Sequence, residues 1–248
     1  MLFDKIDLST LSVEELRLLR ARMQVIFQDP MASLNPRMTV LDAISHPLKI
    51  HHPGKLKDKE SITCAILEDV GLSPPEVFLN KYPHQLSGGQ RQRVVIARAL
   101  VTEPDLILAD EPIAMADVSV RALLLELMIS LKDEHNLTYL FITHDLATAK
   151  YICDRIGVMY LGKLVEVSDL SSVYGNSLHP YTQALMAAVP IPDPLYRRNQ
   201  PLPRGEIPSP INPPPGCHFH PRCPYAENIC GRDESGHTVA CHFVERFR

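Results

Sequence analysis

The sequence predicts an α/β fold built around a mostly parallel sheet. Short apolar runs that end in polar residues alternate with segments of helical periodicity. This alternation is typical of strand–helix–strand units, which place parallel strands side by side. A chain of 248 residues with 45% hydrophobic side chains can also bury a sizeable core. The predicted strands are residues 24–28, 105–110, 138–142 and 155–160.

The first half of the chain contains two helices with clear end signals. Ser12-Val13-Glu14-Glu15 is a capping box, which opens a helix expected to reach about Arg22. Residues 57–70 have apolar side chains at helical spacing and precede Gly71, a typical C-cap residue. Together with helices on both sides of Pro74-Pro75, they predict a helical subdomain at about residues 36–102.

The second half continues the alternation and then changes in composition. Helices are expected at 118–134 and 145–153, and a hairpin turn at 160–165. Ten prolines between Pro190 and Pro215 exclude a helix or central strand there. They favour an extended arm, with a disordered linker as the alternative.

Residues Leu86-Ser87-Gly88-Gly89-Gln90 are the most informative segment of the chain. Adjacent glycines let a backbone approach phosphate oxygens, and Ser87 adds a hydroxyl donor. The apolar helix that follows offers free N–H groups and a positive dipole end to an anion. For the tripeptide alone, a loop leading into a helix is the simpler interpretation.

A second motif is the apolar run 106–110, which ends in Asp110 and continues into Glu111. It predicts a buried parallel strand with its acids at the carboxyl end, the edge where open α/β sheets bind ligands. Asp110 is a candidate Mg²⁺ ligand, because this hard cation prefers oxygen. Glu111 is a candidate to orient an attacking water. A strand followed by a solvated acidic turn is the alternative.

Taken in order, these motifs resemble those of ABC-transporter ATPases, and the resemblance implies a P-loop NTPase fold of the ABC type. The string LSGGQRQR resembles the signature motif, and LILADEP resembles a Walker B strand. His144 resembles the switch histidine that reaches the γ-phosphate. Gln28 resembles the Q-loop glutamine, which touches Mg²⁺ and the attacking water. The structural alternative for His144 is an ordinary histidine after a strand. The alternative for Gln28 is a strand that ends in a turn.

Two departures from the family pattern stand out. Asp117 matches the D-loop aspartate, but Ala114-Met115-Ala116 replaces the usual Ser-Ala-Leu. The 248 residues also contain no G-x-x-x-x-G-K-[ST] motif to cradle phosphates. Residues 2–8 resemble the segment that normally follows the P-loop helix. We therefore expect an ABC-type ATPase domain over 1–175 that lacks its N-terminal Walker A portion and does not hydrolyse ATP alone.

Residues 176–248 resemble the C-terminal region of oligopeptide and dipeptide importer ATPases, through Leu178–Thr182 and Ile207–Pro210. This Pro/Cys-rich extension carries four cysteines with spacing unlike a zinc knuckle or a common ferredoxin run. The string 216–224 resembles a tail that in some members carries a [4Fe–4S] cluster. That cluster, Zn²⁺ and free thiols remain open. The candidate ligands are Cys217, Cys223, Cys230 and Cys241, with His218, His220, His237 and His242 as alternatives.

The resemblance implies an ATP-binding subunit that uses ATP and Mg²⁺ to energise import of oligopeptides or dipeptides. Implied partners are a second ABC ATPase in a head-to-tail dimer, two membrane permease subunits, and an extracytoplasmic peptide-binding protein acting on the permease. There are two alternatives. One is a degenerate subunit that only donates its LSGGQ face to a partner ATPase, and the other is a non-transport ABC ATPase.

Net charge and hydropathy narrow the possible partners and the expected location of the protein. A net charge of −4 provides no electrostatic case for nucleic acid. No apolar run approaches the ~20 residues that cross a bilayer, and no signal peptide is visible. We expect a peripheral protein at the cytoplasmic face of the cell membrane.

Overall fold

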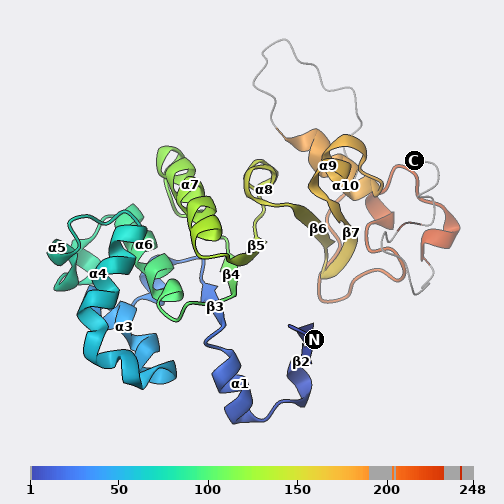
Figure 1. Cartoon of the computed structure of the whole chain (residues 1–248). Helices are drawn as coiled ribbons and strands as arrows, with labels where there is room; N and C mark the ends of the chain where they lie inside the picture. Colours follow the sequence, from blue (N-terminus) through green and yellow to red (C-terminus); the bar gives the residue numbers. More distant parts are fainter. Residues whose placement is uncertain (1, 190–202, 204, 232–240, 242–248) are drawn as a thin grey trace. The chain divides into compact units, whose positions relative to one another are not determined.

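The computed structural model describes residues 2–189, 203, 205–231 and 241 (Figure 1). The chain divides into two compact units, Met1–His144 and Asp145–Arg248. The domain boundary predicted between residues 175 and 176 stays a prediction.

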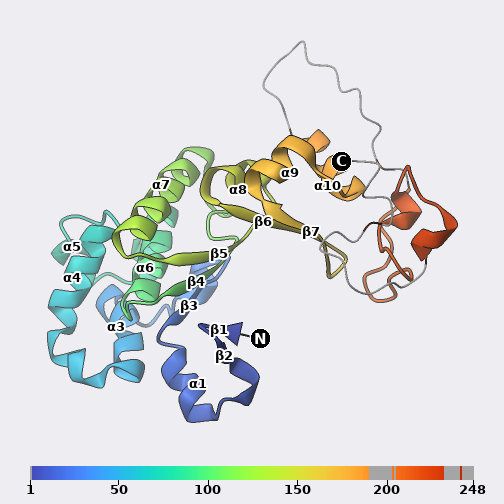
Figure 2. The same cartoon turned by 45° about the vertical axis from the view of Figure 1, so that its right-hand side comes forward.

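The first unit contains a three-stranded parallel sheet, which confirms the predicted strand arrangement at its centre. Its order is β3 (Met23–Ile26), β4 (Leu106–Asp110) and β5 (Thr138–Ile142). The register places Val25 beside Leu108, and Leu108 beside Leu140. Helices α6 (Gly88–Leu100) and α7 (Val118–Glu134) run alongside this sheet (Figure 2). The carboxyl ends of all three strands meet at one edge, where the candidate site lies.

The segment between β3 and β4 is helical, as predicted. In the core, Ile44, Leu48 and Leu67 are fully buried, so α3 and α4 pack through apolar side chains. Gly71 has a φ of +70°, and Leu72 N–H donates to Leu67 O, which ends α4 as expected. The elements are α2 (Pro30–Ser33), α3 (Val40–His51), η2 (Pro53–Asp58), α4 (Lys59–Asp69), α5 (Glu76–Leu79), η3 (Pro83–Gln85) and α6.

The N-terminal part begins with a short hairpin and a capped helix. Strands β1 (Leu2–Phe3) and β2 (Ile6–Asp7) pair antiparallel, and η1 (Leu8–Thr10) follows. The predicted capping box of α1 (Val13–Leu19) is present, but the helix ends three residues before Arg22. It ends early because the chain must extend to enter β3 at Met23.

The second unit is described by itself. Strand β6 (Arg155–Tyr160) pairs antiparallel with β7 (Lys163–Asp169), which confirms the hairpin. This pair is a separate sheet, so residues 155–160 do not extend the parallel sheet as expected. The two-residue turn explains the pairing of β6 with β7, because Leu161 and Gly162 both have positive φ and reverse the chain. The helical elements are α8 (Leu146–Ile152), α9 (Leu170–Asn176), α10 (Pro180–Ala188), η4 (His220–Arg222) and η5 (Asn228–Gly231).

The hairpin anchors the first part of the C-terminal region. Val158, Tyr160, Val165 and Phe219 form a buried apolar cluster. The buried Glu166 carboxylate accepts hydrogen bonds from the backbone N–H groups of residues 178 and 179 at the start of α10. Of the predicted proline-rich arm, residues 190–202 and 204 lie outside the described residues. In the described ranges, no helix is both long and apolar enough to cross a membrane.

Candidate functional site

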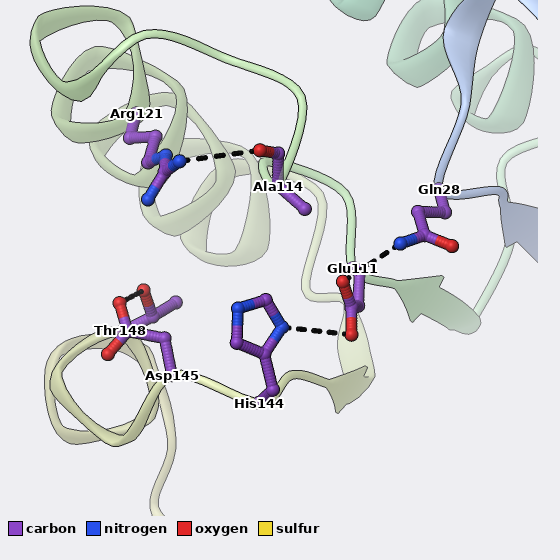
Figure 3. A network of polar contacts seen from close by, with 7 residues as sticks. All are labelled: Gln28, Glu111, Ala114, Arg121, His144, Asp145 and Thr148. Carbon is purple, nitrogen blue, oxygen red and sulfur yellow. Dashed lines mark hydrogen bonds and ion pairs between the residues drawn. The ribbon is translucent and has the colours of Figure 1, made fainter.

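Three predicted residues from three separate segments meet at the carboxyl edge of the parallel sheet (Figure 3). Gln28 Nε2 donates to Glu111 Oε2 at 3.0 Å. His144 Nδ1 lies 3.0 Å from Glu111 Oε1. Both oxygens of one carboxylate are therefore engaged by groups that follow β3 and β5. Only 22% of the Glu111 side chain is exposed, against 74% for His144, so the carboxylate is the inner member of the group.

The backbone of Glu111 is itself constrained. Its φ of +44° is unusual for a residue with a side chain. Its N–H donates to Ile142 O at 2.9 Å, which ties the end of β4 to the end of β5. Such a conformation costs about 1–3 kcal/mol and persists only where surrounding contacts hold it. The conformation turns the side chain toward Gln28 and His144.

Asp110 is the last residue of β4 and pairs in register with Ile142. This places its carboxylate one position before Glu111, at the edge where ligands bind parallel sheets. Mg²⁺ usually takes only one or two protein oxygens and fills its other positions with water and phosphate oxygens. Asp110 fits that role, and the amide oxygen of Gln28 is not used in the bond to Glu111. The donor set therefore suits Mg²⁺ bound together with a nucleotide.

The LSGGQ segment forms the start of α6. Ser87 is the N-cap, and its Oγ accepts from Gln90 N–H at 3.2 Å. Gln90 Oε1 accepts in return from Ser87 N–H at 3.0 Å. A Cβ added at Gly88 would meet no atom within 4 Å, whereas one at Gly89 would lie 3.1 Å from Val120. The Gly88 side is thus open for a ligand to approach the helix N-terminus.

The loop between β4 and α7 is held by a residue that the sequence analysis did not select. Arg121 Nε donates to Ala116 O at 2.9 Å. Arg121 Nη2 donates to Ala114 O at 3.4 Å, the contact drawn in Figure 3. Asp117 is the N-cap residue of α7, but its side chain makes no capping hydrogen bond to that helix. The only sequence signal for Arg121 was its place one helical turn after Asp117.

The tail cysteines do not form a metal site in the described residues. None of the four is disulfide-bonded, and no group of three or more His, Cys, Asp or Glu side chains in those ranges could hold a metal ion. Of the alternative ligands, His218 Nδ1 pairs with Leu161 O, and His220 Nδ1 pairs with Cys217 O. His237 and His242 lie outside the described residues. The geometry therefore gives no support to the predicted cluster or zinc ion.

Comparisons with known proteins show that this chain is similar to ABC-type ATP-binding proteins of oligopeptide transport. Residues 1–114 match the family described as ABC transporter, and residues 165–230 match the family described as oligopeptide/dipeptide transporter, C-terminal region. The oligopeptide transport ATP-binding protein AppF of Bacillus subtilis is 47% identical over 98% of this chain and 76% of its own length. OppF of Salmonella typhimurium, described in the same words, is 49% identical over 96% and 74%.

A solved structure resembles the fold. The dimeric, post-hydrolysis structure of the ATP-binding cassette MJ0796 bound to ADP and Pi matches with a TM-score of 0.59 and 32% identity. The match covers 68% of this chain and 72% of that one.

Proposed function

Because this chain belongs to the ABC-type ATP-binding proteins of oligopeptide transport, we propose that it energises peptide import by closing on ATP together with a second ATPase subunit. ATP hydrolysis drives the import of oligopeptides or dipeptides across the cytoplasmic membrane. The observation that carries this proposal is the open, capped start of α6 at Ser87–Gln90. It presents a hydroxyl and unpaired helix N–H groups to an anion. In a head-to-tail dimer, that anion is the triphosphate held by the partner's P-loop.

The carboxyl edge of the sheet supplies the second set of groups. Asp110 and Gln28 would hold Mg²⁺, which neutralises phosphate charge. Glu111 polarises the attacking water, and His144 contacts the γ-phosphate. The Glu111 carboxylate accepts from Gln28 in the structure, and its remaining lone pairs can also accept from a water. Asp117 would contact the nucleotide across the dimer.

In this proposal, the chain presents Ser87–Gln90 to an ATP whose triphosphate is held by another subunit. The altered loop at 114–116 also fits the alternative, a degenerate subunit that donates only Ser87–Gln90. In the main proposal and in this alternative, ATP is bound between two subunits, which together form a composite site. The two differ in whether Glu111 contributes to ATP hydrolysis.

The experiment is a mixing assay. The purified chain with Mg²⁺-ATP is expected to show no turnover above background. Mixed with a homologous subunit that contains G-x-x-x-x-G-K-[ST], it is expected to raise Mg²⁺-dependent phosphate release above that of the subunit alone. Equal rates with and without this chain would contradict the composite site. Substantial turnover by the isolated chain would contradict the need for a second subunit.

Partners and location follow from the same proposal. The ATPase pair docks on two membrane permease subunits at the cytoplasmic face of the membrane. An extracytoplasmic peptide-binding protein acts on those permeases and selects the peptide. No nucleic acid takes part.

For the tail, we keep a [4Fe–4S] cluster as the proposal, with Zn²⁺ and free thiols as alternatives. Burial raises the pKa of Cys223 to about 11, against a backbone hydrogen bond at Tyr225 that lowers it, and the neighbouring thiols of Cys217, Cys241 and Cys230 add smaller increases. The other three thiols therefore lie close enough to Cys223 to influence its ionisation, although the described residues contain no group arranged to hold a metal. Backbone pairing supports this, because Cys217 N–H donates to Cys230 O at 2.9 Å.

Metal analysis of anaerobically purified protein tests the tail proposal. A cluster predicts iron, sulfide and broad absorbance near about 400 nm. Stoichiometric zinc without iron would replace the cluster with a zinc site. The absence of both metals would leave free thiols as the correct alternative.

A further inference from the structure

Three arginines on α6 each donate to a backbone carbonyl in a different neighbouring segment. The pairs are Arg91 with Pro83, Arg93 with Val70, and Arg98 with Ser33. The first two acceptors belong to the helical segment that precedes α6. The third lies in the short segment that follows Gln28, so Arg98 joins the helix of Ser87–Gln90 to the loop of a residue that contacts Glu111.

The segment from Asp29 to Leu34 is held by local hydrogen bonds at its start and by a buried side chain at its end. Asp29 Oδ1 accepts from Met31 N–H at 2.7 Å, and Ser33 N–H donates to Asp29 O at 3.1 Å. Leu34 is only 2% exposed, which anchors the far end in the core. A single helical turn leaves its last carbonyls without partners inside the helix. Arg98 supplies the donor for one of them, at Ser33.

The environment of Arg98 makes this bond hard to give up. Burial lowers the pKa of Arg98, which reports a guanidinium largely removed from water. A charged donor in that position loses more when its acceptor moves away than an exposed one does. The flanking Ala97 and Ala99 are buried, so the backbone of α6 is closely packed at this point. Eleven residues, or about 16 Å of helix, separate Arg98 from Ser87.

We infer that Arg98 is a positioning residue that fixes the 29–34 segment to α6, so that nucleotide contact at Ser87–Gln90 is transmitted to the loop of Gln28. Because α6 is a continuous helix, a shift at its N-terminus moves Arg98 and, through Ser33, the segment beside Gln28. The inference rests on the proposed function, since it requires a partner subunit to bring ATP to Ser87–Gln90. The inference adds a physical link between nucleotide contact at Ser87–Gln90 and Gln28, which donates to Glu111.

Amide hydrogen exchange of the full chain tests this link. Exchange is measured in two segments, residues 87–91 and 31–34, with and without Mg²⁺-ATP and a P-loop-containing homologous subunit. In the unaltered chain, both segments are expected to gain protection, the second by about five-fold or more, the lower range of typical allosteric couplings. In Arg98→Gln, protection should appear at 87–91 and be largely lost at 31–34. Arg98→Lys, which keeps a charged donor, should restore part of it.

Arg93→Gln is the matched control. It removes the same kind of bond from the same helix, but its acceptor is Val70 at the end of α4. Protection at 31–34 should therefore survive in this variant, which separates the specific link from general loosening of α6.

The possible outcomes separate a failure of the Arg98 link from a failure of the composite ATP site. Protection at 87–91 without protection at 31–34 in the unaltered chain would overturn the link alone. Equal protection at 31–34 in the unaltered chain and Arg98→Gln would also overturn it. No protection at 87–91 in any variant would overturn the proposed composite site, and the link with it.

Discussion

At the residue scale, Ser87 and Ser12 make the same local structure in different surroundings. Each is the N-cap of a helix in a complete capping box, Ser87 with Gln90 and Ser12 with Glu15. Ser12 opens α1, whereas Ser87 opens the helix whose Gly88 side is free for a ligand. The pair therefore separates the contribution of a cap to stability from its contribution to nucleotide contact.

Replacing either serine by alanine should lower the free energy of unfolding by about 1 kcal/mol, because each variant loses one N-cap hydrogen bond. Only Ser87→Ala should also lower phosphate release in the mixture with a P-loop-containing subunit. A hydrogen bond to a charged group contributes about 1.5–3 kcal/mol, so the loss should be about ten-fold or more. Denaturant unfolding and phosphate release measure the two effects. Equal rates for the two variants would exclude Ser87 from the composite site.

At the element scale, α6 combines a binding end with a structural body. Its N-terminus holds the two glycines, and its later turns are buried at Val95, Ile96 and Ala97. Glycine in a helix costs about 0.5–1 kcal/mol relative to alanine. At Gly88 the missing Cβ faces open space, so packing within this chain does not require glycine there.

Gly88→Ala is therefore expected to raise the free energy of unfolding by up to about 1 kcal/mol, while lowering phosphate release in the mixture at least about ten-fold. The added methyl group stabilises the helix but occupies the approach to its N-terminus. Gly175→Ala in α9 is the control, because its Cβ would also meet no atom within 4 Å. It should stabilise the chain without changing phosphate release. If Gly88→Ala left phosphate release unchanged, the open glycine side would not be a ligand surface.

At the scale of the whole molecule, one face of the parallel sheet carries exposed apolar side chains. Val25, Leu140 and Ile142 are 37%, 52% and 49% exposed, and Phe27 just beyond β3 is 53% exposed. The register places Val25, Leu108 and Leu140 in one row across the three strands. Contiguous apolar surface of this kind marks a place where another segment or chain packs.

The chain by itself should consequently self-associate as its concentration rises and bind a hydrophobic dye. Leu140→Gln should weaken self-association, whereas Met159→Gln, at a 58% exposed position in the second unit, should not. Sedimentation and dye fluorescence measure the effect. A monomer that binds no dye at high concentration would show that this face is not an interaction surface.

Much of the fold and of the candidate site was predictable from the sequence, for a local reason. Capping boxes, the Gly71 helix end and the hairpin turn depend on backbone preferences of a few adjacent residues. The side chains that follow each strand at the sheet edge were likewise readable as Gln28, Glu111 and His144. Their identities, together with the LSGGQ segment, determined the family.

Only the tertiary structure decided how distant segments meet. Gln28 and Glu111 are 83 positions apart, and nothing local specifies that one carboxylate accepts from both Gln28 and His144. Arg121 and Arg98 escaped the sequence analysis because their acceptors are backbone carbonyls, which every residue carries and no motif reveals. The pairing of β6 with β7 and the arrangement of the tail cysteines likewise depend on contacts that no local sequence pattern specifies. Local patterns specify elements and donors, whereas the packed chain determines which acceptors and partner strands they reach.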